Sequence, residues 1–239
     1  MVVDGASTDG SNEIIEKYSS RLAYWCSEPD AGQADALVKG LQRAKGEILG
    51  WLNSDDWLVE GALDAVAKAF SENPGADVVY GQTLETDEAG NVSKHIVPEP
   101  ITHKSLLQFW RNYFLPPQPA IFFKRSLYES VRGIDTSLHY AMDYDLWLQF
   151  VTRTRFHYIP QVLAYQRMHP ESKTVQDVQG QRFMEEWRIV QHRHLQSQPA
   201  YWRLRAGYAQ ARYYGVSPAK YALGLLRHLS RRFFAISVY

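Results

Sequence analysis

The apolar run at residues 48–52 constrains the fold of this chain most, because it is short and stops abruptly at polar residues. Ile48-Leu49-Gly50-Trp51-Leu52 leads directly into Asn53-Ser54-Asp55-Asp56. Such a run is typical of a buried strand that ends at the carboxyl edge of a parallel sheet. Ligands of α/β proteins bind outside that edge. The sequence therefore predicts an α/β fold with a binding site just after residue 52.

Short strands and helices alternate through the first hundred residues. The patterns predict strands at 1–3, 48–52, 78–81 and 92–97, and helices that start at Ser11 or Asn12 and that span 33–44 and 62–70. Ile14, Ile15 and Tyr18 fall on one face of the first helix. The strand at 92–97 returns across the turn at 88–91 as a hairpin. This alternation predicts a mostly parallel, Rossmann-like sheet flanked by helices.

The second half of the chain differs in its sequence pattern, because several prolines interrupt it between residues 98 and 119. We expect a helix at about 104–112, a strand at 120–123 and a further helix from about Asp143. Residues 181–239 predict two or three helices. The predicted divisions are residues 1–98, residues 99–178 and a basic helical tail at 179–239.

Charge is balanced over the 239 residues, with 26 basic and 26 acidic side chains, but it is unevenly distributed. Nine of the basic residues and none of the acidic ones lie after residue 186. The single cysteine, Cys26, excludes an intramolecular disulfide. The first residues do not resemble a signal peptide, and no apolar run approaches the length of about 18 residues that indicates a membrane span. These features predict a cytoplasmic protein.

The basic tail has two competing interpretations. Its mixture of Lys and Arg with aromatic residues and leucines suits docking of residues 187–239 on an anionic membrane, at the inner face of the cell membrane. Alternatively, the tail folds back on the acidic body. Because no nucleic-acid-binding motif accompanies the charge, the sequence predicts no nucleic-acid partner.

Four segments together resemble the inverting glycosyltransferases of family 2, which have the GT-A fold. The segments are Val2-Val3-Asp4-Gly5-Ala6-Ser7-Thr8-Asp9-Gly10-Ser11, Asp30-Ala31-Gly32-Gln33-Ala34-Asp35-Ala36-Leu37, Gly50-Trp51-Leu52-Asn53-Ser54-Asp55-Asp56 and Asp143-Tyr144-Asp145-Leu146-Trp147-Leu148. The resemblance implies inverting transfer of a sugar from a nucleotide-sugar donor, UDP-linked, to a hydroxyl of a saccharide or a lipid-linked acceptor. It also implies a place in the synthesis of a surface polysaccharide or glycoconjugate. Residues 1–98 would then be the nucleotide-sugar-binding half and residues 99–178 the acceptor-binding and catalytic half.

The acidic cluster after the strand at 48–52 stands at the place of the family's Asp-x-Asp motif. The departing diphosphate is highly charged and needs a divalent cation held by oxygen ligands. The resemblance assigns the Mn²⁺ or Mg²⁺ ligand chiefly to Asp55, because Asn53 replaces the first Asp of the motif. Asn53 and Asp56 are then expected to contact the nucleotide. Without this context, the cluster would be interpreted as a solvated turn.

Asp4 resembles the nucleobase-binding residue of the family. Its carboxylate can accept the imide N–H of uracil or thymine, or the N1–H of guanine. An Asx turn that opens the Gly-Ser loop is the alternative role, and the two roles are compatible. Asp30 is a second candidate for nucleotide binding, although an Asp beside Gly is commonly a turn residue.

Asp143 resembles the catalytic base of the family, although Met142 replaces the Glu that precedes it there. A single displacement needs one carboxylate to accept the proton of the attacking hydroxyl. The alternative is that Asp143 only caps the helix that it opens. A helix N-terminus also lowers the pKa of a carboxylate, which opposes the role of a base.

Four further residues complete the predicted site. Arg167 and His169 resemble the segment that closes over the diphosphate, where Arg binds phosphate and His can ligate the metal. Gln118 and Trp57 are expected to face the acceptor, Trp57 by stacking on a sugar ring.

The resemblance also sets limits on the activity. Family members begin with a strand and helix that precede the residue matched by Met1, so we expect this chain to be incomplete at its start. A non-catalytic remnant that binds nucleotide-sugar or carbohydrate is therefore the alternative function. Nucleotidyltransferases are a further rival class, but they need a Gly-rich basic phosphate loop where this chain has an acidic one.

Overall fold

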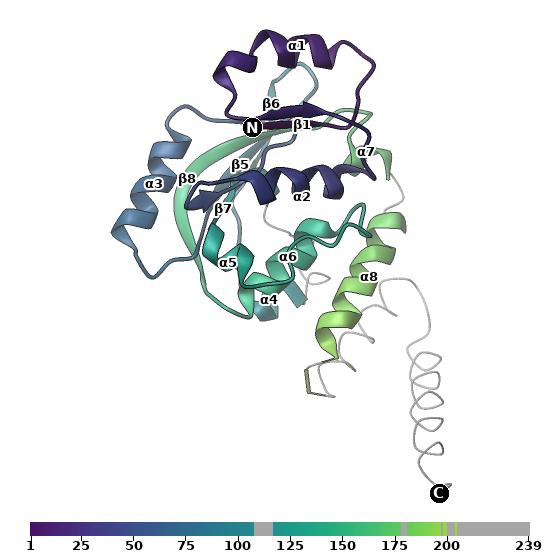
Figure 1. Cartoon of the computed structure of the whole chain (residues 1–239). Coiled ribbons are helices and arrows are strands. Elements are labelled where there is room, and N and C mark those ends of the chain that lie inside the picture. The colour runs from purple at the N-terminus through teal and green to yellow at the C-terminus, as the bar shows by residue number, and fades with distance from the viewer. Residues whose placement is uncertain (108–116, 178–180, 197, 200–203, 205–239) are drawn as a thin grey trace, which may run out of the picture.

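The computed structural model describes residues 1–107, 117–177, 181–196, 198–199 and 204, and it confirms the α/β class (Figure 1). The strands are β1 Val2–Asp4, β2 Trp25–Ser27, β3 Ile48–Leu49, β4 Trp57–Leu58, β5 Val78–Thr86, β6 Val92–Ile96, β7 Ile121–Lys124 and β8 Phe156–Arg167. The α-helices are α1 Ser11–Lys17, α2 Gln33–Arg43, α3 Ala62–Glu72, α4 His103–Leu107, α5 Arg125–Glu129, α6 Met142–Val151, α7 Lys173–Gln176 and α8 Gln181–Leu195. Residues 108–112 of the predicted helix 104–112 lie outside the described residues.

The strands of the described residues form two sheets. β1 and β2 pair in parallel as a small sheet of their own. The larger sheet has the order β3-β7-β5-β8-β4, and β6 pairs with β5 as the predicted hairpin. Asp87 closes the hairpin turn by accepting hydrogen bonds from the backbone and side-chain N–H groups of Asn91, at 2.8 and 2.9 Å.

The prediction of a mostly parallel sheet is wrong for the larger sheet. Within it, β5 and β8 pair in parallel, whereas β3 with β7, β7 with β5, β5 with β6 and β4 with β8 are antiparallel. β3 and β5 do run in the same direction, but β7 lies between them. The alternation of strands and helices therefore predicted the directions of β3 and β5 correctly. It could not predict that β7, which comes much later in the chain, would insert between them.

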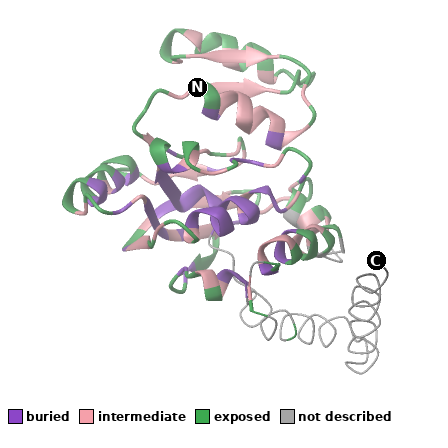
Figure 2. Ribbon diagram, turned by 60° about the horizontal axis from the view of Figure 1, so that its bottom comes forward, coloured by how far each residue is buried: buried purple, intermediate pink, exposed green. Residues whose placement is uncertain are grey.

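Side chains alternate across the larger sheet and build two cores on its opposite faces. Val78, Tyr80 and Phe123 point to the face covered by α2, α4, α6 and α8. Val79 and Phe122 point to the face covered by α3. Figure 2 shows that buried residues gather in this sheet and in α6. The fully buried Trp147 of α6 stacks on Trp51, with ring centroids 5.4 Å apart, and so joins α6 to the segment after β3.

The unit formed by α1, β1 and β2 is less well packed. The predicted apolar face of α1 is not buried, because Ile14 and Tyr18 are 61% and 47% exposed and no residue of α1 is buried. α2 agrees with its predicted span to within one residue, and its Val38 and Leu41 pack against the main core. α2 is therefore the helix that connects the small unit to the rest of the molecule.

The described part of the tail folds back on the body, as one of the two interpretations expected. Val190 and Gln191 of α8 are fully buried, and the Gln191 side chain donates to the carbonyl of Leu107 at 2.8 Å. Arg193 binds Asp135 at 2.8 Å. No helix of the described residues has both the length and the apolar character needed to cross a membrane. The predicted division at residue 98 remains a prediction, and strands from both sides of it share one sheet.

Candidate functional site

The loop after β3 holds two carboxylates in different surroundings. Asp56 is buried, and its carboxylate accepts the backbone N–H of Arg167 at 3.0 Å and the side chain of Asn53 at 3.4 Å. Burial, assisted by the neighbouring charge of Asp55, raises the pKa of Asp56 to about 6. Asp56 therefore ties the β3 loop to the end of β8, while Asp55 remains partly exposed.

Asp55 and His169 face each other across the site. The Oδ2 of Asp55 lies 3.0 Å from the Nε2 of His169, and both side chains are partly exposed. A carboxylate oxygen and an imidazole nitrogen at this spacing suit a divalent cation such as Mn²⁺. Among the described residues, no cluster of three or more His, Cys, Asp or Glu side chains is arranged to hold a metal. A metal held by Asp55 and His169 would need further oxygen ligands from a substrate or from water.

A chain of hydrogen bonds extends from this loop to residues that the sequence did not single out. Asn53 accepts the side-chain N–H of Gln33 at 2.7 Å, and the Oε1 of Gln33 accepts the ammonium of Lys173 at 2.8 Å. Gln33 lies within one of the four quoted segments, at the start of α2. Lys173 had no such signal, because only the fold brings α7 next to α2.

Arg167 lies beside the buried Asp56 and contacts an aromatic pair. Its guanidinium carbon is 5.0 Å from the centre of the Trp57 ring, and Trp57 stacks on Tyr165 at 4.9 Å. The Nε of Arg167 is buried and has no hydrogen-bond partner among the described residues. A guanidinium held in this way can bind an anionic oxygen. Trp57 positions Arg167, and its predicted stacking on a sugar remains a prediction.

Asp4 and Asp30 lie together in the small unit. Asp4 accepts the backbone N–H and hydroxyl of Ser7 and the hydroxyl of Ser27, and these bonds lower its pKa. The backbone N–H of Ala6 also bonds to Asp4, so the loop supplies donors to both oxygens of this carboxylate. Asp30 accepts the backbone N–H of Gly32 at 2.8 Å, and a Cβ at Gly5 would lie 2.7 Å from its Oδ2. The bond from the backbone N–H of Ser7 to the Asp4 carboxylate forms the predicted Asx-type turn.

Asp143 lies in the first turn of α6 but does not cap it. The helix begins at Met142 with Ala141 as its N-cap, so Asp143 lies two positions after the cap, and the cap-only interpretation does not describe it. Burial raises the pKa of Asp143 to about 6, although the backbone N–H of Tyr144 and the charge of Lys173 oppose this effect. Desolvation outweighs the helix N-terminus, contrary to the expectation that the pKa would be lowered. A partly exposed carboxyl with this pKa can accept a proton at neutral pH.

Gln118 is hydrogen-bonded to the segment that follows β3. Its Nε2 donates to the carbonyl of Trp51 at 2.6 Å, and its buried Oε1 has no partner among the described residues. Trp51 in turn stacks on Trp147, one helical turn after Asp143. The structure therefore brings Asn53, Asp55, Asp56, Arg167 and His169 into one cluster, and links Gln118 and Asp143 to it through Trp51 and Lys173. Asp4 and Asp30 belong to the small unit, which α2 connects to the cluster through the bond between Gln33 and Asn53.

Comparison with known proteins gives a family match. The model of glycosyl transferase family 2 matches residues 1–132. An uncharacterized glycosyltransferase of Methanocaldococcus jannaschii is 21% identical over 212 residues, which cover 85% of this chain and 73% of that protein. An uncharacterized glycosyltransferase of Mycobacterium tuberculosis is 30% identical over 152 residues, which cover 62% of this chain and 55% of that protein. The chain thus spans little more than half of the Mycobacterium relative.

Two solved structures share the fold. TarS of S. aureus in complex with UDP superposes with a TM-score of 0.61 at 20% identity, covering 91% of this chain and 63% of that one. A mannosyltransferase of Pyrobaculum calidifontis in complex with GDP-Man and Mn²⁺ superposes with a TM-score of 0.54 at 19% identity. The match covers 96% of this chain and 70% of that one. Both likenesses confirm the GT-A architecture of the sheet and its helices. Since the family model covers more than half of the residues, and the loop after β3 carries the expected carboxylates, this chain belongs to glycosyl transferase family 2.

Proposed function

We propose that this protein transfers a sugar from a UDP-linked donor to a hydroxyl of a saccharide or lipid-linked acceptor, with inversion, in the synthesis of a surface polysaccharide or glycoconjugate. One observation carries the proposal. The Asp55 and His169 pair, beside the buried Asp56, is linked through Asn53, Gln33 and Lys173 to the environment of Asp143. A site for a charged leaving group is thus coupled to a site for a base.

Asp55 and His169 would hold Mn²⁺ or Mg²⁺ together with the diphosphate. When bound, the metal offsets the charge of the departing nucleoside diphosphate. Arg167, which is half-buried, supplies a second positive group, and a guanidinium can bind two phosphate oxygens. The Mn²⁺ in the Pyrobaculum mannosyltransferase supports this assignment. We expect a chelator to abolish turnover, and Asp55→Ala to have the same effect.

The donor is proposed to be UDP-linked because the pKa of Asp4 is lowered by its hydrogen bonds, and an ionised carboxylate can accept an imide N–H. Guanine offers a similar donor at N1, so the chemistry of Asp4 alone admits GDP. The UDP and UDP-GlcNAc complexes of TarS support the choice of uracil. Binding of UDP and GDP, each with Mn²⁺, measured by calorimetry, tests the choice directly. Tighter binding of GDP would contradict it.

Asp143 acts as the base in the proposed mechanism. Its ionised carboxylate takes the proton of the acceptor hydroxyl while the hydroxyl oxygen attacks the anomeric carbon, and the nucleoside diphosphate leaves from the opposite side. Gln118 and Trp57 are proposed to contribute to the acceptor side of the site, Gln118 through its bond to the carbonyl of Trp51 and Trp57 by stacking on a sugar ring. Inversion follows from the single displacement, so an α-linked donor must give a β-linked product.

The decisive experiment measures binding and turnover on the same preparation. We expect UDP-GlcNAc with Mn²⁺ to bind and to be slowly hydrolysed when no acceptor is added, with release of UDP. Asp143→Asn should keep donor binding but lose about a hundredfold or more in kcat. Donor binding by the wild-type chain without any hydrolysis or transfer would favour the alternative, a non-catalytic nucleotide-sugar-binding protein.

The basic residues beyond the described body are proposed to dock the protein on an anionic membrane surface. α8 packs against the body, where its Arg193 binds Asp135. Six of the nine basic residues after residue 186, however, lie after residue 204. Each basic residue near an anionic surface contributes about 1 kcal/mol. Sedimentation with vesicles of increasing anionic-lipid content should carry down the full chain, and a chain ending at residue 204 should stay in solution. Equal behaviour of the two chains would contradict the proposal.

A further inference from the structure

The turn that precedes α6 is held by a carboxylate from a distant helix. The Oε1 of Glu186 accepts the backbone N–H of His139 at 2.9 Å, and its Oε2 accepts those of Tyr140 and Ala141 at 2.7 and 2.9 Å. Three successive N–H groups thus point at one carboxylate, which is a strong, charge-assisted arrangement. α6 has no capping side chain of its own, so Glu186 fixes the path by which the chain enters the helix.

A second charged group holds the same turn from its other side. The ammonium of Lys173 donates to the carbonyl of His139 at 2.9 Å and also to Gln33 at 2.8 Å. Lys173 interacts favourably with both Glu186 and Asp143. The backbone of the turn is therefore held through its N–H groups by α8 and through a carbonyl by α7, and Asp143 follows two residues later.

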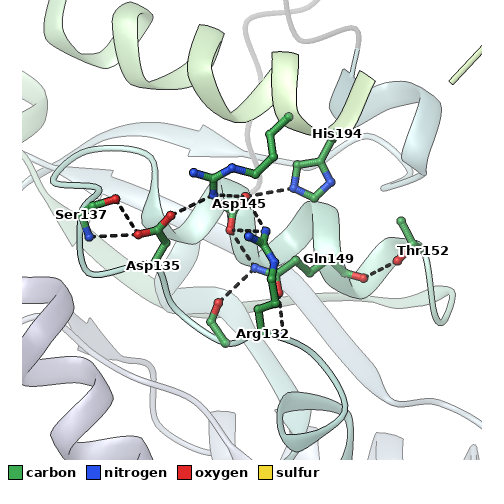
Figure 3. Close-up of polar contacts among 9 residues, drawn as sticks. Arg132, Asp135, Ser137, Asp145, Gln149, Thr152 and His194 are labelled. Carbon is green, nitrogen blue, oxygen red and sulfur yellow. Dashed lines mark hydrogen bonds and ion pairs between the residues drawn. The ribbon is translucent and has the colours of Figure 1, made fainter. Parts of the chain in front are cut away.

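α8 can hold the turn firmly because it is anchored to α6 at a second point. His194 and Arg193 approach the fully buried Asp145, with distances of 2.9 and 3.5 Å to its Oδ1. Figure 3 shows Asp145 at the centre of this group, with His194, Arg132 and Gln149 around it. Val190, between the two anchors, is fully buried. Glu186 therefore projects from a helix whose position relative to α6 is fixed.

We infer that Glu186 is a positioning residue that sets the location of the Asp143 carboxyl, so that α8 belongs to the catalytic unit. This inference rests on the proposed role of Asp143. Neither α6 nor α8 lies within residues 1–132, to which the family match extends. Loss of the carboxylate would leave three N–H groups without their common acceptor and would loosen the turn. A small displacement of a base costs far more in turnover than in donor binding.

The test compares Glu186→Gln with Glu185→Gln in the full chain. Gln keeps the size of Glu but removes the charge and one acceptor oxygen, and the exposed Glu185 of the same helix is the matched control. UDP release from UDP-GlcNAc with Mn²⁺ gives kcat and KM, and hydrogen exchange reports on amides 139–145. For Glu186→Gln we expect faster exchange there, a fall of about tenfold or more in kcat and an unchanged KM. Glu185→Gln should match the wild type in all three.

Two results would overturn the inference: unchanged exchange at residues 139–145 in Glu186→Gln, or faster exchange with unaltered kcat. If Glu186→Gln fails to fold, Glu186→Asp replaces it, since Asp keeps the charge but draws it back by one methylene. A selective loss of kcat in this variant supports positioning, and proportional loss of kcat and donor binding contradicts it. If the wild type releases no UDP, the proposed function of the chain fails, and the exchange measurement alone decides whether Glu186 orders the turn.

Discussion

The carboxyl of Asp143 is subject to opposing influences whose balance sets its working pH. Desolvation favours the protonated form, and Lys173 and the Tyr144 N–H favour the ionised form, with a resulting pKa of about 6. Because the base must be ionised, we expect kcat to rise as the pH increases through about 6. A pH profile of UDP release measures this directly. An acidic limb near the ordinary Asp value of 3.8 would contradict the desolvated environment.

The same pKa makes a prediction for stability. Since the folded pKa is higher than the unfolded value, the folded chain binds more protons, and the contribution of Asp143 to stability falls as the pH rises from about 4 through about 6. Asp143→Asn removes this cost. We therefore expect the variant, at pH 7, to unfold at the same urea concentration as the wild type or a higher one. A clear loss of stability would instead indicate a mainly structural role.

Gly5 is required for the close approach of the first loop to Asp30. A Cβ at this position would lie 2.7 Å from the Oδ2 of Asp30, which is closer than such contacts allow. We expect Gly5→Ala to displace Asp30 and to weaken UDP binding, measured by calorimetry with Mn²⁺. Gly75→Ala is the control, because a Cβ there meets no atom within 4 Å. Equal binding by the two variants would show that Asp30 is not needed for the nucleotide.

The sequence could predict those site residues whose signal is local. Asn53, Asp55 and Asp56 follow one short apolar run, and their loop forms as expected. Gln33 and Lys173 could not be found in this way, because their role depends on a contact between residues 140 positions apart. The upward pKa shift of Asp143 was missed for the same reason. The helix N-terminus is visible in the sequence, whereas the packing that removes water from the carboxyl is not.

At the scale of elements, the strand predicted at 48–52 shows how tertiary contacts shorten a local pattern. β3 ends at Leu49. Beyond it, Gly50 lies against the ring of Phe122, and the carbonyl of Trp51 accepts the side chain of Gln118 in place of a neighbouring strand. The prediction that the whole run is buried is correct only at Leu49, because Trp51 is half-buried and Leu52 is 42% exposed. The helix predicted at 33–44 agrees with α2 to within one residue, because the spacing of its apolar residues is visible in the local sequence.

The pairing of α6 with α8 depends on Asp145, which is fully buried among Gln149, Arg193 and His194. Removing one partner from a buried charged group costs about 3 kcal/mol. We expect Asp145→Asn to lower the free energy of unfolding by about this amount, measured by urea denaturation. Arg132→Gln is the control, because this side chain is 59% exposed and should cost less than about 1 kcal/mol. Equal effects would contradict the central role of Asp145.

At the scale of the whole molecule, α8 completes the core on one face of the larger sheet. A chain ending at residue 180 would expose the surface covered by Val190 and Leu195 and would lose Glu186. We expect it to melt at a lower temperature than a chain ending at residue 204, and to bind a dye for exposed apolar surface. Circular dichroism and dye fluorescence of the two chains provide the measurement. Identical melting would show that α8 is dispensable for the fold.

The contact between Asp55 and His169 joins residues 114 positions apart, and this separation has a consequence during synthesis. The ribosome adds about 5–20 residues per second, so Asp55 exists for on the order of ten seconds before His169 is made. For that time the emerging chain carries only one member of the pair, and Asp143 enters late in the same interval. If the proposed function is correct, a nascent chain that still lacks His169 has an incomplete site. It therefore does not hydrolyse nucleotide-sugar before β8 and His169 have been synthesised.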